Sequence, residues 1–398
     1  MTNTTTLLHL SLIKNIGPGS VLKIIHALHK NFYEISENPQ LAKPTFDLSQ
    51  FYQFTTREFQ TKFDLTPRIS QLLVTGLADR ETLEEELLLI KKYNIDLLSF
   101  LDDGYPEMLK QIHHPPLIIY CKGAPLGENK RLGIVGSRKA DSYAKQSINA
   151  IVPELVSHDW EIVSGGALGV DSMAHRATLN AGGKTIVVFG SGLMQPYPSE
   201  NKELFRSVVR NGGTLVSAFS LNTTPHKGNF PARNRIIAGL SQGCIIVQAA
   251  QRSGALITAQ FSLDQGRQVF ALPGKIDNEL SAGCHKIIQQ GAKLVTNVED
   301  ILEEFGETAQ EALAPVTEAS QPTPARPECF VKQNVSRDTS IHPLIKLLEE
   351  PCSLDEIASK TKQSLEELQN ELFQLQLEGK IKQNFAGLWE TCPGEACP

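Results

Sequence analysis

The stretch Leu132-Gly133-Ile134-Val135-Gly136-Ser137-Arg138 decides the fold class, because an apolar run ends there in a glycine turn that leads into a helical pattern. Similar short apolar runs recur along the chain, and helical segments fill the intervals. These runs are Glu161 to Val163, Thr185 to Phe189, Thr214 to Val216, Cys244 to Val247, Gln268 to Ala271 and Lys293 to Val295. Apolar strands that alternate with helices are typical of a parallel sheet covered on both faces. The sequence therefore predicts an α/β fold with an extended Rossmann-like, doubly wound parallel sheet, which binds ligands at the carboxyl ends of its strands.

A chain of 398 residues is too long for one ordinary core, so further domains are expected. Residues 1–98 carry apolar positions at helical spacing, and residues 305–340 contain four prolines among Thr, Ala, Glu and Gln, as in a flexible linker. We expect an N-terminal helical domain over 1–98, the Rossmann-like domain over 99–304, a linker over 305–340 and a winged-helix-like domain over 341–392.

The two flanking domains carry motifs that are open to more than one interpretation. Gly17-Pro18-Gly19 separates two helical stretches in the layout of a helix-hairpin-helix (SAM-like) unit, whose second helix can hold a phosphate. A plain helix turn explains the same residues equally well. The C-terminal pattern has winged-helix order, but residues 341–390 hold 5 basic and 9 acidic residues. That charge favours contact with protein, or self-association, over duplex DNA.

Composition limits the location of the protein. No apolar run approaches the ~20 residues of a membrane-spanning helix, so we expect no membrane segment. The N-terminus lacks the basic region and the cleavage site of a secretory signal. The seven cysteines form neither a disulfide framework nor zinc-binding pairs. A cytoplasmic protein with reduced thiols, no metal and no cofactor is the simplest prediction.

Charge is distributed unevenly along the chain. The net charge is −6, which by itself argues against a nucleic-acid protein. Residues 130–304, however, contain 18 Lys plus Arg against 14 Asp plus Glu. Because local patches rather than the total charge determine phosphate binding, the basic surplus favours an anion site in the central domain.

Candidate binding residues follow the ends of three predicted strands. The turns are Gly136-Ser137-Arg138, Ser164-Gly165-Gly166 and Arg252-Ser253-Gly254. Glycine lets the backbone approach a ligand closely, and helices that start behind such turns direct N–H groups outward. A structural explanation, in which any Rossmann-like sheet needs small residues at tight turns, suffices for one turn. Three turns together favour a phosphate-binding site.

A further cluster runs from Lys227 to Arg235 and precedes a predicted helix, Ile236 to Leu240. It combines three cations, Lys227, Arg233 and Arg235, with Asn234 and the ring of Phe230. Cations neutralise phosphates and a ring stacks on any base, a combination used for single-stranded DNA with little sequence preference. The alternative is a capped helix with solvated charges and Phe230 in the core. The predicted DNA-binding residues are Gly136, Ser137, Arg138, Gly165, Gly166, Lys227, Phe230, Arg233, Asn234, Arg235, Ser253 and Gly254.

No motif supports catalysis. The chain has no GxxxxGK[ST] string, and the glycine turn after Val135 lacks the third glycine of a dinucleotide fingerprint. Asp171 and His175 are four residues apart and could form an acid–base pair, but a structural hydrogen bond explains them better. The alternative hypothesis is a nucleotide-cleaving phosphoribohydrolase-like Rossmann enzyme, whose PGGxGTxxE string is absent.

Six ordered motifs resemble the DNA-processing protein A (DprA, also called Smf) family. They are LGIVGSR at 132–138, SGGALGVDSMAH at 164–175, GSGLMQPYP at 190–198, FPARNRIIAGLS at 230–241, SGALITA at 253–259 and LPG at 272–274. The resemblance implies a non-enzymatic protein that coats and protects incoming single-stranded DNA in natural transformation and helps to load RecA recombinase. It also implies a homodimer formed through the central fold.

Three positions depart from the family pattern as the resemblance gives it. Ser217-Ala218 stands where Ser-Glu is usual, Val247-Gln248-Ala249 stands for Val-Glu-Ala, and Gly283-Cys284-His285 stands for Gly-x-Asn. Two of the changes remove carboxylates. This loss should not weaken binding to an anion, but it puts in doubt whether a bound nucleotide or a partner surface is kept.

Overall fold

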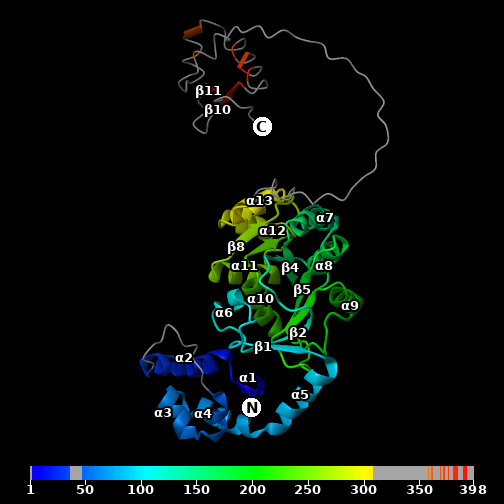
Figure 1. Ribbon diagram of the computed structural model, residues 1–398. Helices are drawn as coiled ribbons and strands as arrows, with labels where there is room; N and C mark the ends of the chain where they lie inside the picture. Colours follow the sequence, from blue (N-terminus) through cyan, green and yellow to red (C-terminus); the bar gives the residue numbers. More distant parts are fainter. Residues whose placement is uncertain are drawn as a thin grey trace, which may run out of the picture. The chain divides into compact units, whose positions relative to one another are not determined.

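The computed structural model describes residues 2–35 and 47–307 and, nearer the C-terminus, 357, 360–361, 368, 371–372, 375, 380–383 and 389–391. The chain divides into two compact units, Met1–Val316 and Thr317–Pro398. The first unit contains the large sheet and the N-terminal helices (Figure 1). The boundary expected near residue 98 lies inside this first unit.

A nine-stranded sheet, in the order β1-β2-β6-β5-β4-β3-β7-β8-β9, forms the centre of the first unit. The strands are β1 Asp96–Ser99, β2 Ile118–Gly123, β3 Arg131–Val135, β4 Glu161–Ser164, β5 Thr185–Phe189, β6 Thr214–Ser217, β7 Gly243–Ile246, β8 Gln268–Ala271 and β9 Lys293–Leu294. From β6 to β9 all neighbours pair in parallel. The chain builds outward from β3 on one side and from β7 on the other, so the topology switches between these two strands.

The seven predicted strands are all present, with ends that agree to within one residue. The prediction missed β1 and β2, which add an antiparallel edge next to β6. The sheet is therefore mixed rather than purely parallel. Four-residue β1 is too short to show an alternating pattern, and the β2 run directly follows Pro115 and Pro116, which are typical of a loop.

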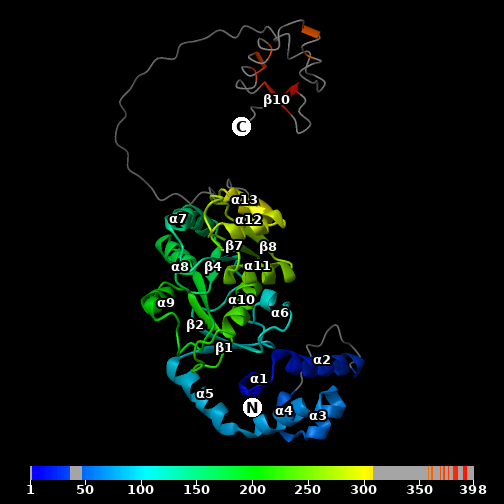
Figure 2. The same ribbon diagram turned by 180° about the vertical axis from the view of Figure 1, so that it is seen from behind.

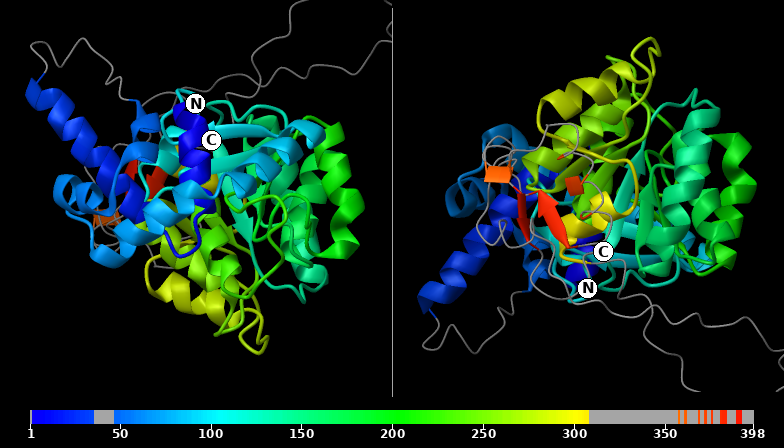
Figure 3. Two further views of the ribbon diagram at one scale, coloured as in Figure 1. Left: turned by 90° about the horizontal axis from the view of Figure 1, so that it is seen from below. Right: turned by 90° about the horizontal axis from the view of Figure 1, so that it is seen from above.

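Helices cover both faces of the sheet, as a doubly wound fold requires. One face carries α7 Ser142–Ser157, α8 Val170–Asn180, α9 Lys202–Arg210 and α13 Glu299–Leu302. The opposite face carries α10 Asn229–Leu240, α11 Gly254–Asp264 and α12 Ala282–Gln289, and the short helix α6 Glu107–Lys110 packs on α10. Figure 2 and the end views of Figure 3 show these two layers on either side of the strands. Within the described residues, no helix is both long and apolar enough to span a bilayer.

The N-terminal helices share a core with one end of the sheet. They are α1 Asn3–Leu12, α2 Pro18–Ile35, α3 Thr56–Phe63, α4 Pro67–Ala78 and α5 Arg80–Tyr93, with a 3₁₀ turn at Leu48–Gln53. Buried side chains such as Leu7, Phe51 and Leu83 belong to the same apolar cluster as Val187 and Phe189 of β5. Glu86 of α5 is tied to the turn after β6, since its Oε1 accepts a hydrogen bond from the Leu221 backbone N–H at 2.7 Å.

The second unit is described only in part. Strands β10 Ile381–Gln383 and β11 Trp389–Thr391 pair antiparallel. A small core of Ile357, Leu368, Leu372, Leu375 and Ile381 lies against Trp389. Most of the expected winged-helix-like domain over 341–392 falls outside the described residues, as does the expected linker from residue 308 onward. The winged-helix assignment therefore stays a prediction.

Candidate nucleic-acid interface

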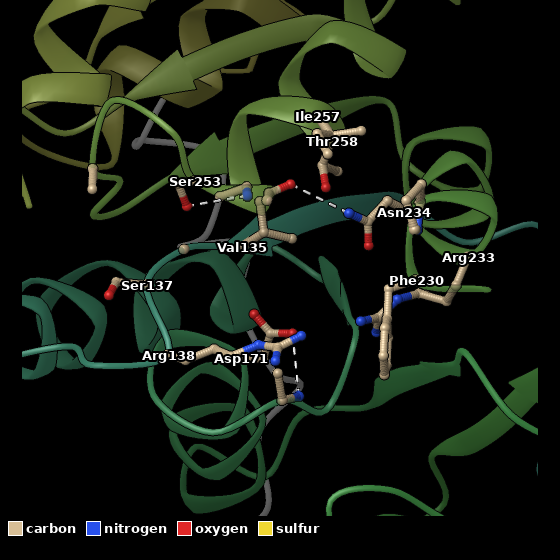
Figure 4. Close-up of a pocket in the computed structure, with 16 residues that line it drawn as sticks. Val135, Ser137, Arg138, Asp171, Phe230, Arg233, Asn234, Ser253, Ile257 and Thr258 are labelled. Atoms are coloured by element: carbon tan, nitrogen blue, oxygen red, sulfur yellow. Dashed lines mark hydrogen bonds between the residues drawn. The ribbon is translucent and has the colours of Figure 1, made fainter. Parts of the chain in front are cut away.

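A groove opens at the carboxyl ends of β3 and β7, at the topological switch of the sheet. Parallel α/β sheets bind their ligands at this position. The cavity has a volume of about 300 Å³ and is lined by the turn after β3, the turn before α8, the first turns of α10 and the first turns of α11 (Figure 4). Three of the glycine and cation segments expected to form an anion site therefore do meet at one place.

A cation and an aromatic ring stand together at the mouth of the groove. The guanidinium carbon of Arg138 lies 5.4 Å from the centroid of the Phe230 ring, over the ring face. The exposed ring of Tyr197 lies beside it, with centroids 5.9 Å apart. Among the described residues Arg138 forms no ion pair, so its charge is available to a ligand. Phe230 is half-buried and does not belong to the core.

The floor of the groove holds a buried arginine and a buried carboxylate. The side chains of Arg233 and Asp171 are 5% and 6% exposed. Nη1 of Arg233 donates to the Val188 carbonyl oxygen at 2.8 Å, and Oδ2 of Asp171 accepts from the Ala167 N–H at 3.3 Å. Burial raises the pKa of Asp171, while the positive charge of Arg233 opposes that shift. Burial likewise lowers the pKa of Arg233, and Asp171 opposes it.

The cluster from 227 to 235 is mostly helical, which corrects the expectation that it precedes its helix. Helix α10 begins at Asn229 rather than near Ile236. Pro231 stands in its first turn, where a missing N–H costs nothing and the fixed φ suits a helix. The helix starts without a side-chain cap.

The structure brings eight of the twelve predicted residues to the cavity wall: Gly136, Ser137, Arg138, Phe230, Arg233, Asn234, Ser253 and Gly254. Gly165 lines the adjoining hollow beneath Phe230. Gly166 is buried and lies under Val187 and Phe205, away from the cavity. Lys227 is exposed on the turn before α10.

Arg235 does not lie in the groove. It is on α10 two residues after Arg233, and its Nη1 donates to the backbone carbonyls of His113 and His114 on the far side of the helix. There it borders a separate cavity of about 690 Å³ that also includes the Gly17-Pro18-Gly19 turn. Of the two arginines in the predicted cluster from Lys227 to Arg235, only Arg233 therefore lines the groove.

Two predicted glycines serve the protein's own packing rather than the approach of a ligand. A Cβ on Gly165 would lie 1.6 Å from Nη1 of Arg233, so this position must be glycine for the buried arginine to fit. A Cβ on Gly136 would lie 2.6 Å from Cγ2 of Val170. Gly254, in contrast, has open space around its Cα.

The start of helix α11 forms another wall of the groove. The hydroxyl of Ser253 caps it by accepting from the Ala255 N–H at 3.3 Å. The Asn234 side-chain amide donates to the Gly254 carbonyl at 3.3 Å and so ties α10 to α11. Ile257 and Thr258 complete the wall.

Asp171 and His175 do not form a hydrogen-bonded pair. Nδ1 of His175 lies 2.7 Å from Oγ1 of Thr185, whose hydroxyl donates to the Ile162 carbonyl at 2.6 Å. His175 is fully buried, and burial lowers its pKa to about 3. The expected structural hydrogen bond of His175 therefore exists, but its partner is a strand residue.

Two of the residues that depart from the family pattern, Gln248 and His285, form hydrogen bonds within the protein. Nε2 of Gln248 donates to Oδ1 of Asp141 at 2.8 Å, and this bond is the largest cause of the lowered pKa of Asp141. Nε2 of His285 lies 2.9 Å from the Gly274 carbonyl oxygen and thereby holds the loop after β8. The side chain of Ala218 packs against the core under α10.

The sequence reasoning missed Asp171, Thr258 and Tyr197 as groove residues. Asp171 lies in the 164–175 motif and Thr258 in the 253–259 motif, but in the sequence each is a single polar position on a predicted helix, with nothing to indicate that it faces the cavity. Tyr197 belongs to the 190–198 motif, and the exposure of 45% that makes it a candidate is visible only in three dimensions.

Comparison with known proteins identifies the family of the chain. Residues 96–306 match the model of the DNA recombination-mediator protein A family. The chain belongs to this family. A relative named Smf from Escherichia coli is 36% identical over 309 residues, 76% of this chain and 79% of the relative. DNA processing protein DprA from Bacillus subtilis is 42% identical over 219 residues, 54% of this chain and 73% of the relative.

Solved structures support the same membership. The X-ray structure of DprA from Streptococcus pneumoniae is 32% identical, covers 76% of this chain and 99% of that chain, and superposes with a TM-score of 0.63. The mostly parallel sheet with helices on both faces is therefore the fold of the family.

Proposed function

We propose that this DprA-family member binds single-stranded DNA in the groove between β3 and β7. The observation that carries the proposal is the guanidinium of Arg138 over the ring of Phe230, inside a cavity at the switch of the sheet. Such a pair offers a phosphate contact and a stacking surface within one nucleotide's length.

The residues around Arg138 and Phe230 favour single-stranded over double-stranded DNA. The cavity of about 300 Å³ is at the small end of ligand pockets and admits one unstacked nucleotide, not a base pair. The uncapped start of α10 and the exposed Lys227 before it suit a phosphate next to the one held by Arg138. Tyr197 offers a second ring for the neighbouring base.

A competition between single- and double-stranded oligonucleotides tests this function. We expect a preference for the single strand and a log affinity that falls by about 2 per log unit of salt, as for three neutralised phosphates. Arg138→Ala and Phe230→Ala should each weaken binding by about tenfold, since a stacking or phosphate contact is worth on the order of 1 to 3 kcal/mol.

The matched control is Arg206→Ala, an exposed arginine on α9 whose side chain pairs with Glu203. It removes the same charge away from the groove. If Arg206→Ala weakened binding as much as Arg138→Ala, or if binding were insensitive to salt, the groove would not be the site.

The wider role that we propose follows from membership of the recombination-mediator family. In this role the protein protects incoming single strands in the cytoplasm, loads a RecA-type recombinase on them and acts as a homodimer without catalysing a reaction. Light scattering of the full chain and a strand-exchange assay with RecA test these parts separately from DNA binding.

A further inference from the structure

A second cavity, of about 690 Å³, lies in the first unit and shares no lining residue with the groove. Its volume is within the range of small-ligand sites. Its walls come from the turn at 17–20 where α2 begins, the segment 111–114 after α6, Arg235 of α10, and Phe261, Asp264 and Gln265 at the end of α11. We call it the histidine cavity, because His113 and His114 belong to its lining.

The guanidinium of Arg235 brings to the histidine cavity a positive charge that no described carboxylate neutralises. Its Nη1 donates to the backbone carbonyl oxygens of His113 and His114. Burial lowers the pKa of Arg235, and no carboxylate opposes that shift. In the groove, by contrast, Asp171 opposes the same shift at Arg233. A half-buried charge that lacks a counter-ion is costly, so an anion bound beside Arg235 would stabilise it.

Two imidazoles stand together in the same cavity. The ring centroids of His113 and His114 are 3.8 Å apart, and both side chains are exposed. Burial lowers the pKa of His114, and the charges of His113 and Arg235 lower it further. The three groups therefore repel one another when all of them are protonated. An anion bound beside them would offset this repulsion and favour protonation.

One carboxylate also lines the histidine cavity and limits the pH at which an anion is attracted. Asp264 is exposed, and its Oδ1 accepts from the Gln260 side-chain amide at 2.8 Å. The turn at 17–20 and the segment 111–112 carry no charged side chain. The charges of Arg235 and Asp264 therefore cancel while both imidazoles are neutral, and protonation of the imidazoles makes the cavity positive.

We propose that the histidine cavity is a second anion site, which binds a phosphate group and binds it more tightly as His113 and His114 become protonated. Guanidinium and imidazolium groups form strong, charge-assisted hydrogen bonds with phosphate. A phosphate has at least three acceptor oxygens and can meet three cationic groups at once, whereas a carboxylate has two. The phosphate can belong to a nucleic-acid backbone or to a small phosphate compound. The inference does not depend on DNA binding in the groove, because the two cavities share no residue.

NMR spectra of the full chain, labelled with ¹³C at histidine Cε1, test the proposal. The signals are followed between about pH 5 and pH 8 in sodium chloride, sodium acetate and sodium phosphate of equal ionic strength. We expect phosphate to raise the titration midpoint of His114 by about 0.5 to 1 pH unit relative to chloride, the effect of one charge about 4 Å away through water. The signal of His26, an exposed histidine of α2 outside the cavity, should titrate alike in all three salts.

Three variants connect the shift to the cavity. His113→Gln and His114→Asn assign the two signals, and asparagine tolerates the φ of 55° at position 114. Arg235→Met removes the central charge and should abolish the effect of phosphate on His114. Its melting temperature shows whether it folds. If it does not fold, His113→Gln replaces it as the test, because loss of one cation should at least halve the shift of His114.

A second arm separates the two sources of phosphate. Oligo-dT is added to a protein that carries Arg138→Ala and Phe230→Ala, which removes the proposed DNA contacts of the groove. A midpoint shift with inorganic phosphate alone would identify a site for small phosphate compounds, and a shift with oligo-dT would identify a site for the strand backbone. Either result supports the proposal.

Three results would overturn the proposal. The midpoint of His114 could be the same in chloride as with either phosphate source. Acetate could shift it as much as phosphate does, which would show a general attraction of anions. The shift could also persist in folded Arg235→Met. None of these results bears on the groove, whose DNA binding is measured by anisotropy with Arg138→Ala.

Discussion

Gly165→Ala should destabilise the first unit far more than a glycine-to-alanine change in open space. The new Cβ would lie 1.6 Å from Nη1 and 2.2 Å from Cζ of Arg233. Arg233 is 5% exposed and cannot swing into water without leaving the groove floor. The clash must therefore move a buried guanidinium or the backbone of the turn.

The size of the effect follows from what Arg233 would lose. Its bond to the Val188 carbonyl, 2.8 Å long, is charge-assisted and worth about 1.5 to 3 kcal/mol. Overpacking of a tight site adds about 1 to 3 kcal/mol. We expect the free energy of unfolding to fall by roughly 3 to 5 kcal/mol. Gly254→Ala is the matched control, because no atom lies within 4 Å of its new Cβ and alanine favours a helix by on the order of 0.5 kcal/mol.

Urea unfolding followed by tryptophan fluorescence measures both variants. Trp160 is buried in the first unit, and a Trp389→Phe background removes the tryptophan of the second. The signal then reports on the unit that contains the groove, which avoids mixing two transitions. A loss below about 1 kcal/mol for Gly165→Ala, which overpacking alone would exceed, would show that Arg233 is not held as described.

Three further changes probe neighbouring features. Gln248→Glu places a second carboxylate against Asp141, so it should lower the free energy of unfolding at neutral pH. The difference from the wild type should shrink as the pH falls toward 4, because the carboxylates become protonated. Urea midpoints measured over a pH series test this, and a difference that stays constant with pH would contradict the pairing. His175, with its pKa lowered to about 3, takes up a proton more readily when unfolded. Stability should therefore fall by about 1.4 kcal/mol per pH unit from pH 6.5 toward 3, and His175→Gln should flatten that slope while losing the bond to Thr185. Tyr197→Ala should weaken single-strand binding by about fivefold while Tyr197→Phe keeps it, and equal losses in anisotropy titrations would point to the hydroxyl instead of the ring.

The sequence was sufficient for the part of the fold that is fully buried. Parallel strands covered on both faces are continuous apolar runs, so β3 to β9 could be read directly. Their carboxyl ends must share an edge, which placed the turns after β3 and β7 in one groove. The antiparallel β1 and β2 gave no such signal, because short edge strands lack a distinctive pattern.

The misplacement of Arg235 has a simple geometric cause. The sequence predicted that residues 227–235 precede their helix, and in an extended loop each of the three cations could have reached the groove. Since α10 begins at Asn229, positions two apart point to nearly opposite sides of a helix. Arg233 therefore faces the floor and Arg235 faces His113. Phe230 kept its predicted place because the first turn of the helix lies at the mouth of the groove.

The N-terminal helices share a core with the sheet, so the segment that matches the family model differs from the segment that packs as one unit. The stretch that matches the family model starts at residue 96, after α5. A fragment that begins at residue 96 would expose the apolar side chains of Val187, Phe189 and their neighbours to water. It would also remove Glu86, which accepts the hydrogen bond of the Leu221 N–H. The stretch that the family model matches is thus smaller than the unit that shares one core. Expression of residues 96–306 alone should yield aggregates, and a fragment meant for crystallisation or screening should begin at the first helix.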